Sequence, residues 1–482
     1  MLIPKPNIMK VNKWLNSPSF YWGSFLIYCL WVIISAIQHE PNGDEYHVWG
    51  MVYDMNLSEL WSAMSSEGHF ITWHILQWPF VKWLGMDYHC IYIVSVSLMI
   101  LAAWLLIFKL DFNIIGKLVI LFSAPFCYYF PIVARCYALI PPILVGLAIL
   151  YQKKEKPFLY CLLLGLLANT HAYIEGLVAI LWCLFVYNQV YCLWKTNPIE
   201  AKRNLYASLI TIAFVIFAFA QVVGGLISVE QGINPPGEGK NTLERWFTIY
   251  NNKNRFKLFT TLHDYFRFIP KLDVLATILL WIFVVIGSYE CIKHSKHIKW
   301  QIICILFFGI SWQIFFACNI YGMNWQRIHL PYFILVFVVW IIYEKGKKKW
   351  SNIALIAFWM LNTSSQYVMV KDFCQRKECD VEIAKQYDAL ITEDAPCYVD
   401  FFIGVHELMK HRFERVTPNM SDSTESEKIL CSLTSKTGDC YLLLITRRLE
   451  IYSNNWHVDT LIYTDEWSNK LYHIKKNEEY IE

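Results

Sequence analysis

The chain has 482 residues, of which 56% are hydrophobic and only 17% are charged, and its formal net charge is +3. Soluble domains usually carry about 25% charged residues, so this shortage of charge indicates a membrane protein. The near balance of basic and acidic side chains gives no case for nucleic acid as a partner.

Long apolar runs predict an all-α polytopic membrane domain over residues 1–367. A helix needs about 20 apolar residues to cross the hydrocarbon core, and about eleven runs approach this length. They are 20–38, 89–108, 117–131, 134–151, 157–173, 175–194, 205–228, 274–292, 300–319, 328–344 and 351–367. The first run follows a polar N-terminus and lacks a small-residue cleavage site, so we expect a retained helix rather than a signal peptide.

The loops between these runs alternate in character. Basic residues recur in short loops at 5–13, 109–117, 153–156, 195–203, 293–299 and 345–349. All of these loops fall on one side if the aromatic segment 70–84 lies in the membrane interface instead of crossing it. The positive-inside rule makes that side cytoplasmic. We therefore expect a multi-pass protein of the cell membrane, with a cytoplasmic N-terminus and with 39–88, 229–273 and 368–482 outside.

The first outer loop, 39–88, concentrates unusual residues. Asp44 and Glu45 follow a Pro-Asn-Gly turn directly after the first span. Glu67 and His69 open the tryptophan-rich segment at 70–84, which is typical of an interfacial helix. An acidic pair at the membrane face can serve chemistry, although an acidic outer loop or a helix cap is the alternative interpretation.

Polar residues also occur at the outer ends of later spans. Arg135 follows a Phe-Pro break, His171 lies between two spans, and Arg327 and His329 precede a late one. Each has an alternative interpretation: Arg135 as a snorkelling side chain, His171 as a structural histidine, and the last pair as simple interface residues. Sugar transfer from a phosphate-linked donor needs a carboxylate base and positive charge for the leaving phosphate. Asp44 or Glu45 suits the first role, and these cationic residues suit the second.

The two remaining outer regions differ from each other. Segment 229–273 begins with a flexible Asn-Pro-Pro-Gly sequence and then mixes aromatic and basic residues. It predicts either an interfacial helix that meets lipid phosphate or a surface cover for the bundle. Segment 368–482 predicts a small soluble α/β domain, with an amphipathic helix near 381–390 and buried strands at 397–402 and 441–445. It contains no catalytic motif that we recognise.

The order of these features resembles the polytopic GT-C glycosyltransferases. An Asp-Glu pair after helix one, followed by Glu-Gly-His at 67–69 and an aromatic helix, is most similar to the branch with protein O-mannosyltransferases and aminoarabinose transferases, a family 39-like group. Further similarities are Ala-Arg-Cys-Tyr-Ala-Leu at 134–139, Thr-His-Ala-Tyr at 170–173 and Gln-Arg-Ile-His-Leu-Pro at 326–331. The resemblance covers the layout of residues 20–370. It departs at 70–72, where Phe-Ile-Thr replaces the usual Pro-Pro, and at Cys136 within the Arg-x-Tyr context.

The resemblance implies a catalytic role for Asp44 as base, with Glu45 supporting the site. It implies substrate contacts from Glu67, His69, Arg135, Tyr137, His171, Arg327 and His329. It also implies a polyprenyl-phosphate-linked sugar donor that arrives laterally from the lipid bilayer, and no metal or other cofactor.

The expected function is therefore an inverting membrane glycosyltransferase at the extracytoplasmic face. Its hydroxyl acceptor is a lipid, a glycan or a protein. One alternative is a transporter or flippase of polyprenyl-linked sugars, which predicts midplane charges and internal repeats that the sequence lacks. A second alternative is a polysaccharide polymerase or ligase that uses pyrophosphate-linked oligosaccharides, for which 229–273 would be the late outer loop.

Overall fold

The structure is a computed structural model of the whole chain. It describes residues 14–39, 41, 43–64, 70–151, 156–230, 289, 293, 299–319, 327, 329–344, 369–370, 380–391, 396–399, 413–415, 439–445, 456–464 and 469–476. The spans expected at 274–292 and 351–367, and the loop at 229–273, lie almost entirely outside these residues. Glu67 and His69 lie outside them as well.

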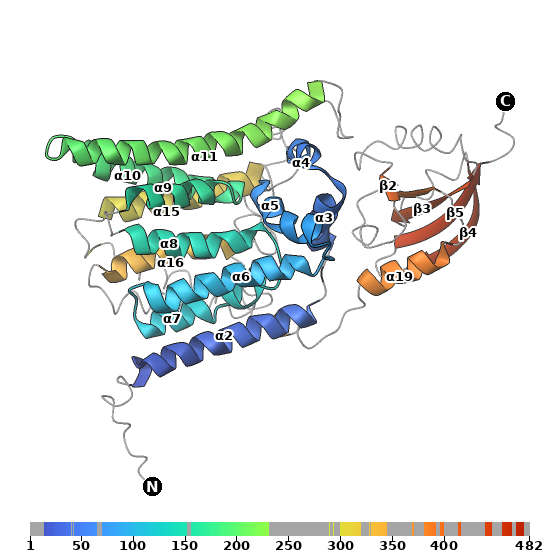
Figure 1. Ribbon diagram of the computed structural model, residues 1–482, viewed down its shortest axis with the longest axis horizontal. Helices are drawn as coiled ribbons and strands as arrows, with labels where there is room; N and C mark the ends of the chain where they lie inside the picture. Colours follow the sequence, from blue (N-terminus) through green and yellow to red (C-terminus); the bar gives the residue numbers. More distant parts are fainter. Residues whose placement is uncertain are drawn as a thin grey trace, which may run out of the picture.

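A bundle of roughly parallel helices forms most of the described chain (Figure 1). Its main members are α2 (Pro18–Gln38), α6 (Cys90–Trp104), α7 (Ile114–Leu121), α8 (Ile140–Tyr151), α9 (Pro157–Ala168), α10 (Glu175–Val186), α11 (Pro198–Glu230), α15 (Lys299–Asn319) and α16 (Leu330–Glu344). Within the described residues, five helical segments are long and apolar enough to cross a membrane, and three shorter apolar helices accompany them. The protein is thus a multi-pass membrane protein.

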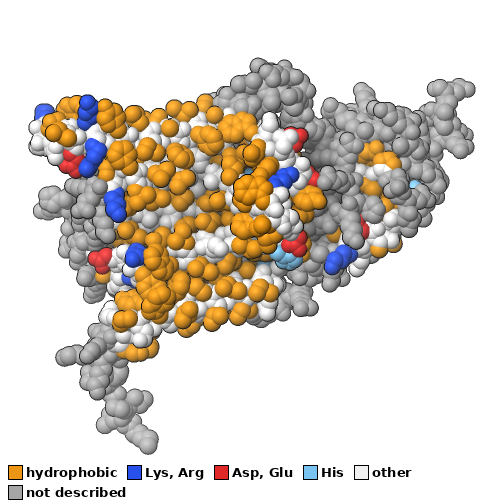
Figure 2. Space-filling view, in the orientation of Figure 1, with side chains coloured by type: hydrophobic (Ala, Val, Ile, Leu, Met, Phe, Trp, Pro, Cys, Tyr) orange, Lys and Arg blue, Asp and Glu red, His pale blue; other side chains and the backbone are white. Residues whose placement is uncertain are grey.

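The bundle is apolar on its outside as well as in its core. A continuous buried cluster runs from Tyr28 and Val32 of α2 to Ile341 and Ile342 of α16. Large apolar side chains such as Ile37, 78% exposed, also cover the outer flanks, and Figure 2 shows this surface as an orange band. A helix that is hydrophobic all round needs an apolar environment on both sides, which a bilayer supplies.

The span expected at 117–131 is not one continuous helix. Helix α7 begins three residues earlier, where the Asn113 side chain accepts a hydrogen bond from the Gly116 N–H at 2.6 Å, and it ends at Leu121. The chain then bends and continues as the π-helical turn η3 (Pro125–Tyr129). Pro125 has no N–H for the helical ladder, so a break before it is physically expected. The break matters because η3 carries Tyr128, whose ring lies against His39, and Tyr129, whose ring lies against His329.

The first outer loop folds into short helices at one end of the bundle, where Figure 1 draws α3, α4 and α5. These are α3 (Gly43–Asp54), α4 (Leu57–Ala63) and α5 (Thr72–Trp78), which continues as the π-turn η1 (Pro79–Trp83). Asn56 and Glu59 form a reciprocal capping box that starts α4. Two hydrogen bonds hold α3 against the end of the same loop. Trp49 donates to the Met86 carbonyl at 3.2 Å, and Lys82 donates to the Tyr53 carbonyl at 2.8 Å.

The C-terminal region contains helix α19 (Asp380–Leu390) and a five-stranded sheet of order β2-β1-β3-β5-β4. The strands are β1 (Cys397–Val399), β2 (Phe413–Arg415), β3 (Asp439–Ile445), β4 (Trp456–Thr464) and β5 (Asn469–Lys476). Strands β2, β1 and β3 are parallel, and β3, β5 and β4 are antiparallel. The helix and two strands lie where the sequence predicts them, whereas β2, β4 and β5 were not predicted.

Candidate functional site

The carboxylate of Glu45 lies at the centre of the site. Its side chain is fully buried, although it stands near the start of α3 at one end of the bundle (Figure 1). One oxygen lies 3.1 Å from Nε2 of His39, and the other accepts the backbone N–H of Ala134 at 2.8 Å. A buried carboxylate is tolerated when it is paired in this way. Glu45 is therefore not the solvated acidic loop residue that the alternative interpretation supposed.

His39 was not among the residues expected from the sequence. Helix α2 ends at Gln38, and the His39 N–H closes its last turn by donating to the Ser35 carbonyl at 2.9 Å. The imidazole then lies edge-on to the rings of Tyr92 and Tyr128, with centroids 6.0 and 6.2 Å away. The side chain is only 6% exposed. The sequence did contain one feature that could have identified His39: it directly follows an apolar span and shortly precedes an acidic pair.

Asp44, the expected base, precedes Glu45 in α3. The structure describes its backbone and not its side chain. The position places Asp44 in the first turn of α3, next to the buried carboxylate.

A second group of polar side chains comes from three other segments. The Tyr137 hydroxyl lies 3.3 Å from Nε2 of His171. Nδ1 of His171 accepts the Tyr173 backbone N–H at 3.1 Å, so a neutral ring carries its proton on Nε2 and donates it to the Tyr137 oxygen. Both Arg135 and Arg327 act electrostatically on the Tyr137 hydroxyl. We call Arg135, Tyr137, His171 and Arg327 the cationic cluster.

Local backbone geometry explains how these residues meet. Arg135 is extended and precedes the short 3-10 turn η4 (Cys136–Leu139), which leads into α8. Helix α9 ends at Ala168, and extended His171 starts another 3-10 turn, η5 (Ala172–Ile174). Trp312 of α15 fixes η5 by donating to the Ala172 carbonyl at 2.8 Å. Arg135 and His171 thus stand directly before short turns that lead into α8 and α10.

His329, the last of the expected site residues, packs against an aromatic ring. It is completely buried, and its ring lies over that of Tyr129 with centroids 4.1 Å apart. Arg327, two residues earlier, is 9% exposed and belongs to the cluster. His329 therefore packs against the ring of Tyr129, whereas Arg327 acts on the Tyr137 hydroxyl.

The acid and the cluster are adjacent through the backbone. Glu45 binds the N–H of Ala134, and Ala134 directly precedes Arg135. Two guanidinium groups near a hydroxyl can bind a phosphate, and the buried Glu45 carboxylate holds the backbone that leads into this cluster. Among the described residues, no group of three His, Cys, Asp or Glu side chains could hold a metal ion.

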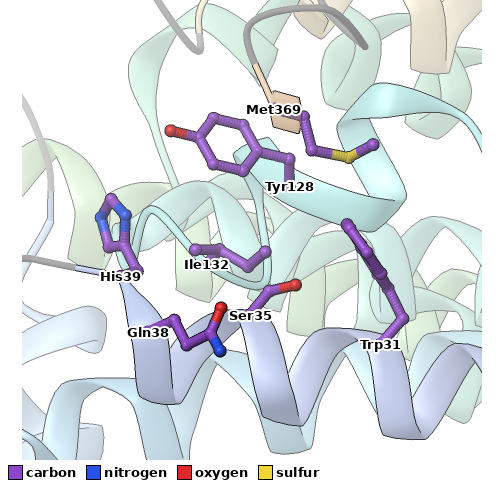
Figure 3. A pocket seen from close by; sticks show the side chains of 7 residues that line it. All are labelled: Trp31, Ser35, Gln38, His39, Tyr128, Ile132 and Met369. Carbon is purple, nitrogen blue, oxygen red and sulfur yellow. The ribbon is translucent and has the colours of Figure 1, made fainter. Parts of the chain in front are cut away.

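His39 also lines a small pocket between α2 and η3 (Figure 3). The pocket is lined by Trp31, Ser35, Gln38, His39, Tyr128, Ile132 and Met369. Four of these residues belong to α2 or directly follow it, and Tyr128 belongs to η3.

A buried amide bridge fastens helix α5 to the rest of the bundle. The Ile71 N–H donates to Oε1 of Gln221 in α11 at 2.8 Å. Nε2 of Gln221 donates to Oδ1 of Asn169 at 3.2 Å, and Nδ2 of Asn169 donates to the Phe214 carbonyl at 2.9 Å. Asn169 lies two residues before His171, so this Asn169–Gln221 bridge links the start of α5 to the turn that carries a cluster residue.

Comparison with known proteins agrees with this architecture. No protein-family model matches the sequence, and no curated protein matches it. The fold is similar to that of ArnT from Cupriavidus metallidurans bound to undecaprenyl phosphate, with a TM-score of 0.57 and 10% sequence identity over 95% of this chain and 98% of that one. The apo state of ArnT from the same organism gives a TM-score of 0.54 and 11% identity over the same shares. The resemblance to the GT-C class is thus confirmed for the fold.

Proposed function

We propose that the protein is an integral-membrane glycosyltransferase that moves a sugar from a polyprenyl-phosphate donor to a hydroxyl acceptor. The observation that carries this proposal is the cationic cluster next to the buried Glu45 carboxylate, at the end of an apolar bundle. A phosphate that stays attached to a membrane lipid can reach only such an interfacial site. The similarly folded ArnT was crystallised with undecaprenyl phosphate, which supports the same class of donor lipid.

The reaction is a single displacement with inversion. The acceptor oxygen attacks the anomeric carbon, and the bond from that carbon to the phosphate oxygen breaks. The electron pair stays on polyprenyl phosphate, whose charge Arg135 and Arg327 offset. The acceptor proton passes to the carboxylate of Asp44.

Glu45 and the cluster residues have supporting roles in this scheme. Glu45 fixes Ala134 and thereby the start of Arg135, while His171 orients the Tyr137 hydroxyl so that its proton points away from the imidazole and towards the phosphate. Glu67 and His69, which follow α4, contact the substrate, and His329 holds Tyr129 in place. The reaction belongs to the extracytoplasmic face, with 1–367 as the catalytic membrane domain and 368–482 as a soluble domain on the same side.

Binding of undecaprenyl phosphate to the purified protein in nanodiscs tests the proposal. Arg327→Gln removes one charge-assisted contact worth about 1.5–3 kcal/mol, so we expect the Kd to rise roughly 10- to 100-fold. Arg203→Gln is the matched control, because Arg203 is 47% exposed and pairs with Glu200 at the opposite end of the bundle. Equal affinity in wild type and Arg327→Gln would contradict a phosphate site at the cluster.

Transfer is then measured with labelled polyprenyl-phosphate monosaccharides in the same nanodiscs. Formation of a new glycosidic bond supports the transferase. Movement of the lipid-linked sugar across liposomes without a new bond would instead identify a transporter. Use of pyrophosphate-linked oligosaccharides only would identify a polymerase or ligase.

A further inference from the structure

The chain between η3 and η4 lies in the buried part of the bundle without forming a helix. Residues 130–135 form turns and bends, and Ile132, Val133 and Ala134 are no more than 6% exposed. Such a segment does not satisfy all of its own backbone N–H and C=O groups as a helix does, and buried groups of this kind need other partners. The partners therefore show what holds this segment in place.

Helix α2 holds the turn η3, from which this segment starts. The Tyr28 hydroxyl donates to the Phe126 carbonyl at 2.8 Å, and the Trp31 indole N–H donates to the Cys127 carbonyl at 3.1 Å. Tyr28 and Trp31 are three residues apart and so share one face of α2. Figure 3 shows Tyr128 of η3 lying across from α2. Two hydrogen bonds from one helix thus fix where η3 lies.

Ser95 of α6 holds the part that follows η3. Its side chain is completely buried, and its hydroxyl oxygen lies 2.8 Å from the Pro131 carbonyl oxygen and 3.4 Å from the Tyr92 carbonyl oxygen of its own helix. The single hydroxyl proton belongs to the shorter contact, so Ser95 donates to Pro131. A serine within a helix commonly bonds back to its own helix. The bond to Pro131 instead joins α6 to a separate segment.

The Ser95 bond lies close in the chain to the cationic cluster. Pro131 is four residues before Arg135, and the Ala134 N–H between them is held by Glu45 at 2.8 Å. Arg135 is extended and directly precedes η4, so the place of its backbone depends on the residues that lead into it. Ser95 and Glu45 thus hold the two ends of the stretch from Pro131 to Ala134.

We propose that Ser95 is a positioning residue: its bond to Pro131 fixes the backbone before Arg135 and thereby holds the guanidinium where the phosphate binds. This role rests on the proposed function. Ser95 does not touch the phosphate and acts only through Arg135. Charge-assisted hydrogen bonds from a guanidinium depend on geometry, and a displacement of about 1 Å by a distant mutation can cost roughly 100-fold in rate. A hydroxyl that holds the backbone can therefore affect the binding of a phosphate that it does not contact.

The test measures binding of undecaprenyl phosphate to the full-length protein in nanodiscs. Ser95→Ala removes only the hydroxyl, and we expect the Kd to rise roughly 3- to 10-fold, which is less than for loss of a cluster arginine itself. Ser24→Ala is the matched control, because Ser24 is also buried but donates to the Phe20 carbonyl of its own helix at 2.9 Å. If Arg327→Gln weakens binding while Ser95→Ala binds like wild type, the positioning role is wrong and the proposed function stands.

A double-variant cycle separates positioning from simple stabilisation. Ser95→Ala is combined with Arg135→Gln, and the effects on binding should not add. Without the guanidinium, loss of the hydroxyl should change the Kd by less than about twofold. The melting temperature should fall by the same amount in both backgrounds, because the bond to Pro131 is lost in each. An equal loss of affinity from Ser95→Ala with and without Arg135 would show that the hydroxyl does not act through Arg135, and the proposal would be overturned.

Amide exchange supplies a readout that needs no lipid. Ser95→Ala should speed hydrogen exchange in the peptide that covers 130–138, whereas Ser24→Ala should leave it unchanged. Unchanged exchange in Ser95→Ala would mean that the hydroxyl does not order this segment, which contradicts the proposal. If the wild-type protein did not bind undecaprenyl phosphate, the proposed function would fail and the positioning role with it, and the exchange would still report whether Ser95 holds the segment.

Discussion

At the scale of single residues, the pairing of Glu45 predicts different effects for two substitutions. Glu45→Ala leaves the buried Ala134 N–H without its acceptor, and such a loss costs about 1–3 kcal/mol of unfolding free energy. Glu45→Gln retains a carbonyl oxygen that can accept this N–H and removes only the negative charge beside His39. We therefore expect Glu45→Gln to lower the unfolding free energy less than Glu45→Ala does. Thermal unfolding of the two variants in the same detergent checks the order. Equal melting temperatures for Glu45→Ala and wild type would show that the bond to Ala134 contributes nothing.

The neighbouring residue, Asp44, carries the prediction about chemistry. Asp44→Asn keeps the shape of the side chain and removes its ability to take a proton. If Asp44 is the base, the rate of sugar transfer should fall about 10²- to 10⁴-fold while donor affinity stays within a few-fold. Asp54→Asn at the other end of α3 is the control, because it makes the same chemical change on an exposed residue of the same helix. Transfer at the wild-type rate in folded Asp44→Asn protein would remove Asp44 from the mechanism.

At the scale of elements, the Asn169–Gln221 bridge predicts how firmly α5 is held. Gln221→Leu removes the acceptor for the Ile71 N–H, and a lost buried hydrogen bond of about 1–2 kcal/mol corresponds to roughly 5- to 30-fold faster amide exchange. Hydrogen exchange followed by mass spectrometry of the peptide that covers 70–78 measures this. Gln301→Leu is the control, since Gln301 joins helices through Tyr151 elsewhere in the bundle. Unchanged exchange in Gln221→Leu would mean that packing alone holds α5.

Comparison of the elements shows which features follow from sequence and which do not. The α2 helix was predicted because an isolated apolar run of this length crosses a bilayer as a helix. The span at 117–131 was mispredicted because hydropathy does not register the bend before Pro125. Strands β2, β4 and β5 were missed, since strand formation depends on the neighbours in the sheet more than on the intrinsic preference of the strand's own residues.

The residues of the candidate site also divide into those that sequence can predict and those that it cannot. Arg135, His171 and Arg327 could be predicted from residue type, because charged and ionisable groups near spans are rare unless they are used. His39 and Tyr128 could not, because their significance lies in contacts with Glu45 and with the pocket, which only the tertiary structure brings together. The division of roles between Arg327 and His329 also needed the structure, since it depends on Tyr129 packing over the histidine.

At the scale of the whole molecule, everything of chemical interest gathers at one end. Figure 1 draws α3, α4, α5 and the C-terminal sheet at the same end of the bundle, and the acid, the cluster and the pocket lie there too. In Figure 2 lysine and arginine side chains gather at the opposite end, which includes the start of α11 with Lys202 and Arg203. By the positive-inside rule basic residues mark the cytoplasmic side, and their position in the fold agrees with the expectation that the end with α3, α4 and α5 faces outwards.

This agreement gives a prediction about orientation. An epitope tag after residue 482 should be open to protease in intact spheroplasts, and a tag inserted between residues 195 and 197, next to the basic start of α11, should be protected. Inverted membrane vesicles should give the reverse pattern. If the tag at 195–197 were digested in spheroplasts while the C-terminal tag survived, Glu45 and the cationic cluster would face the cytoplasm. A donor presented at the outer leaflet could then not reach them, and the proposed reaction would have to be given up even though the bundle and its site remained as described.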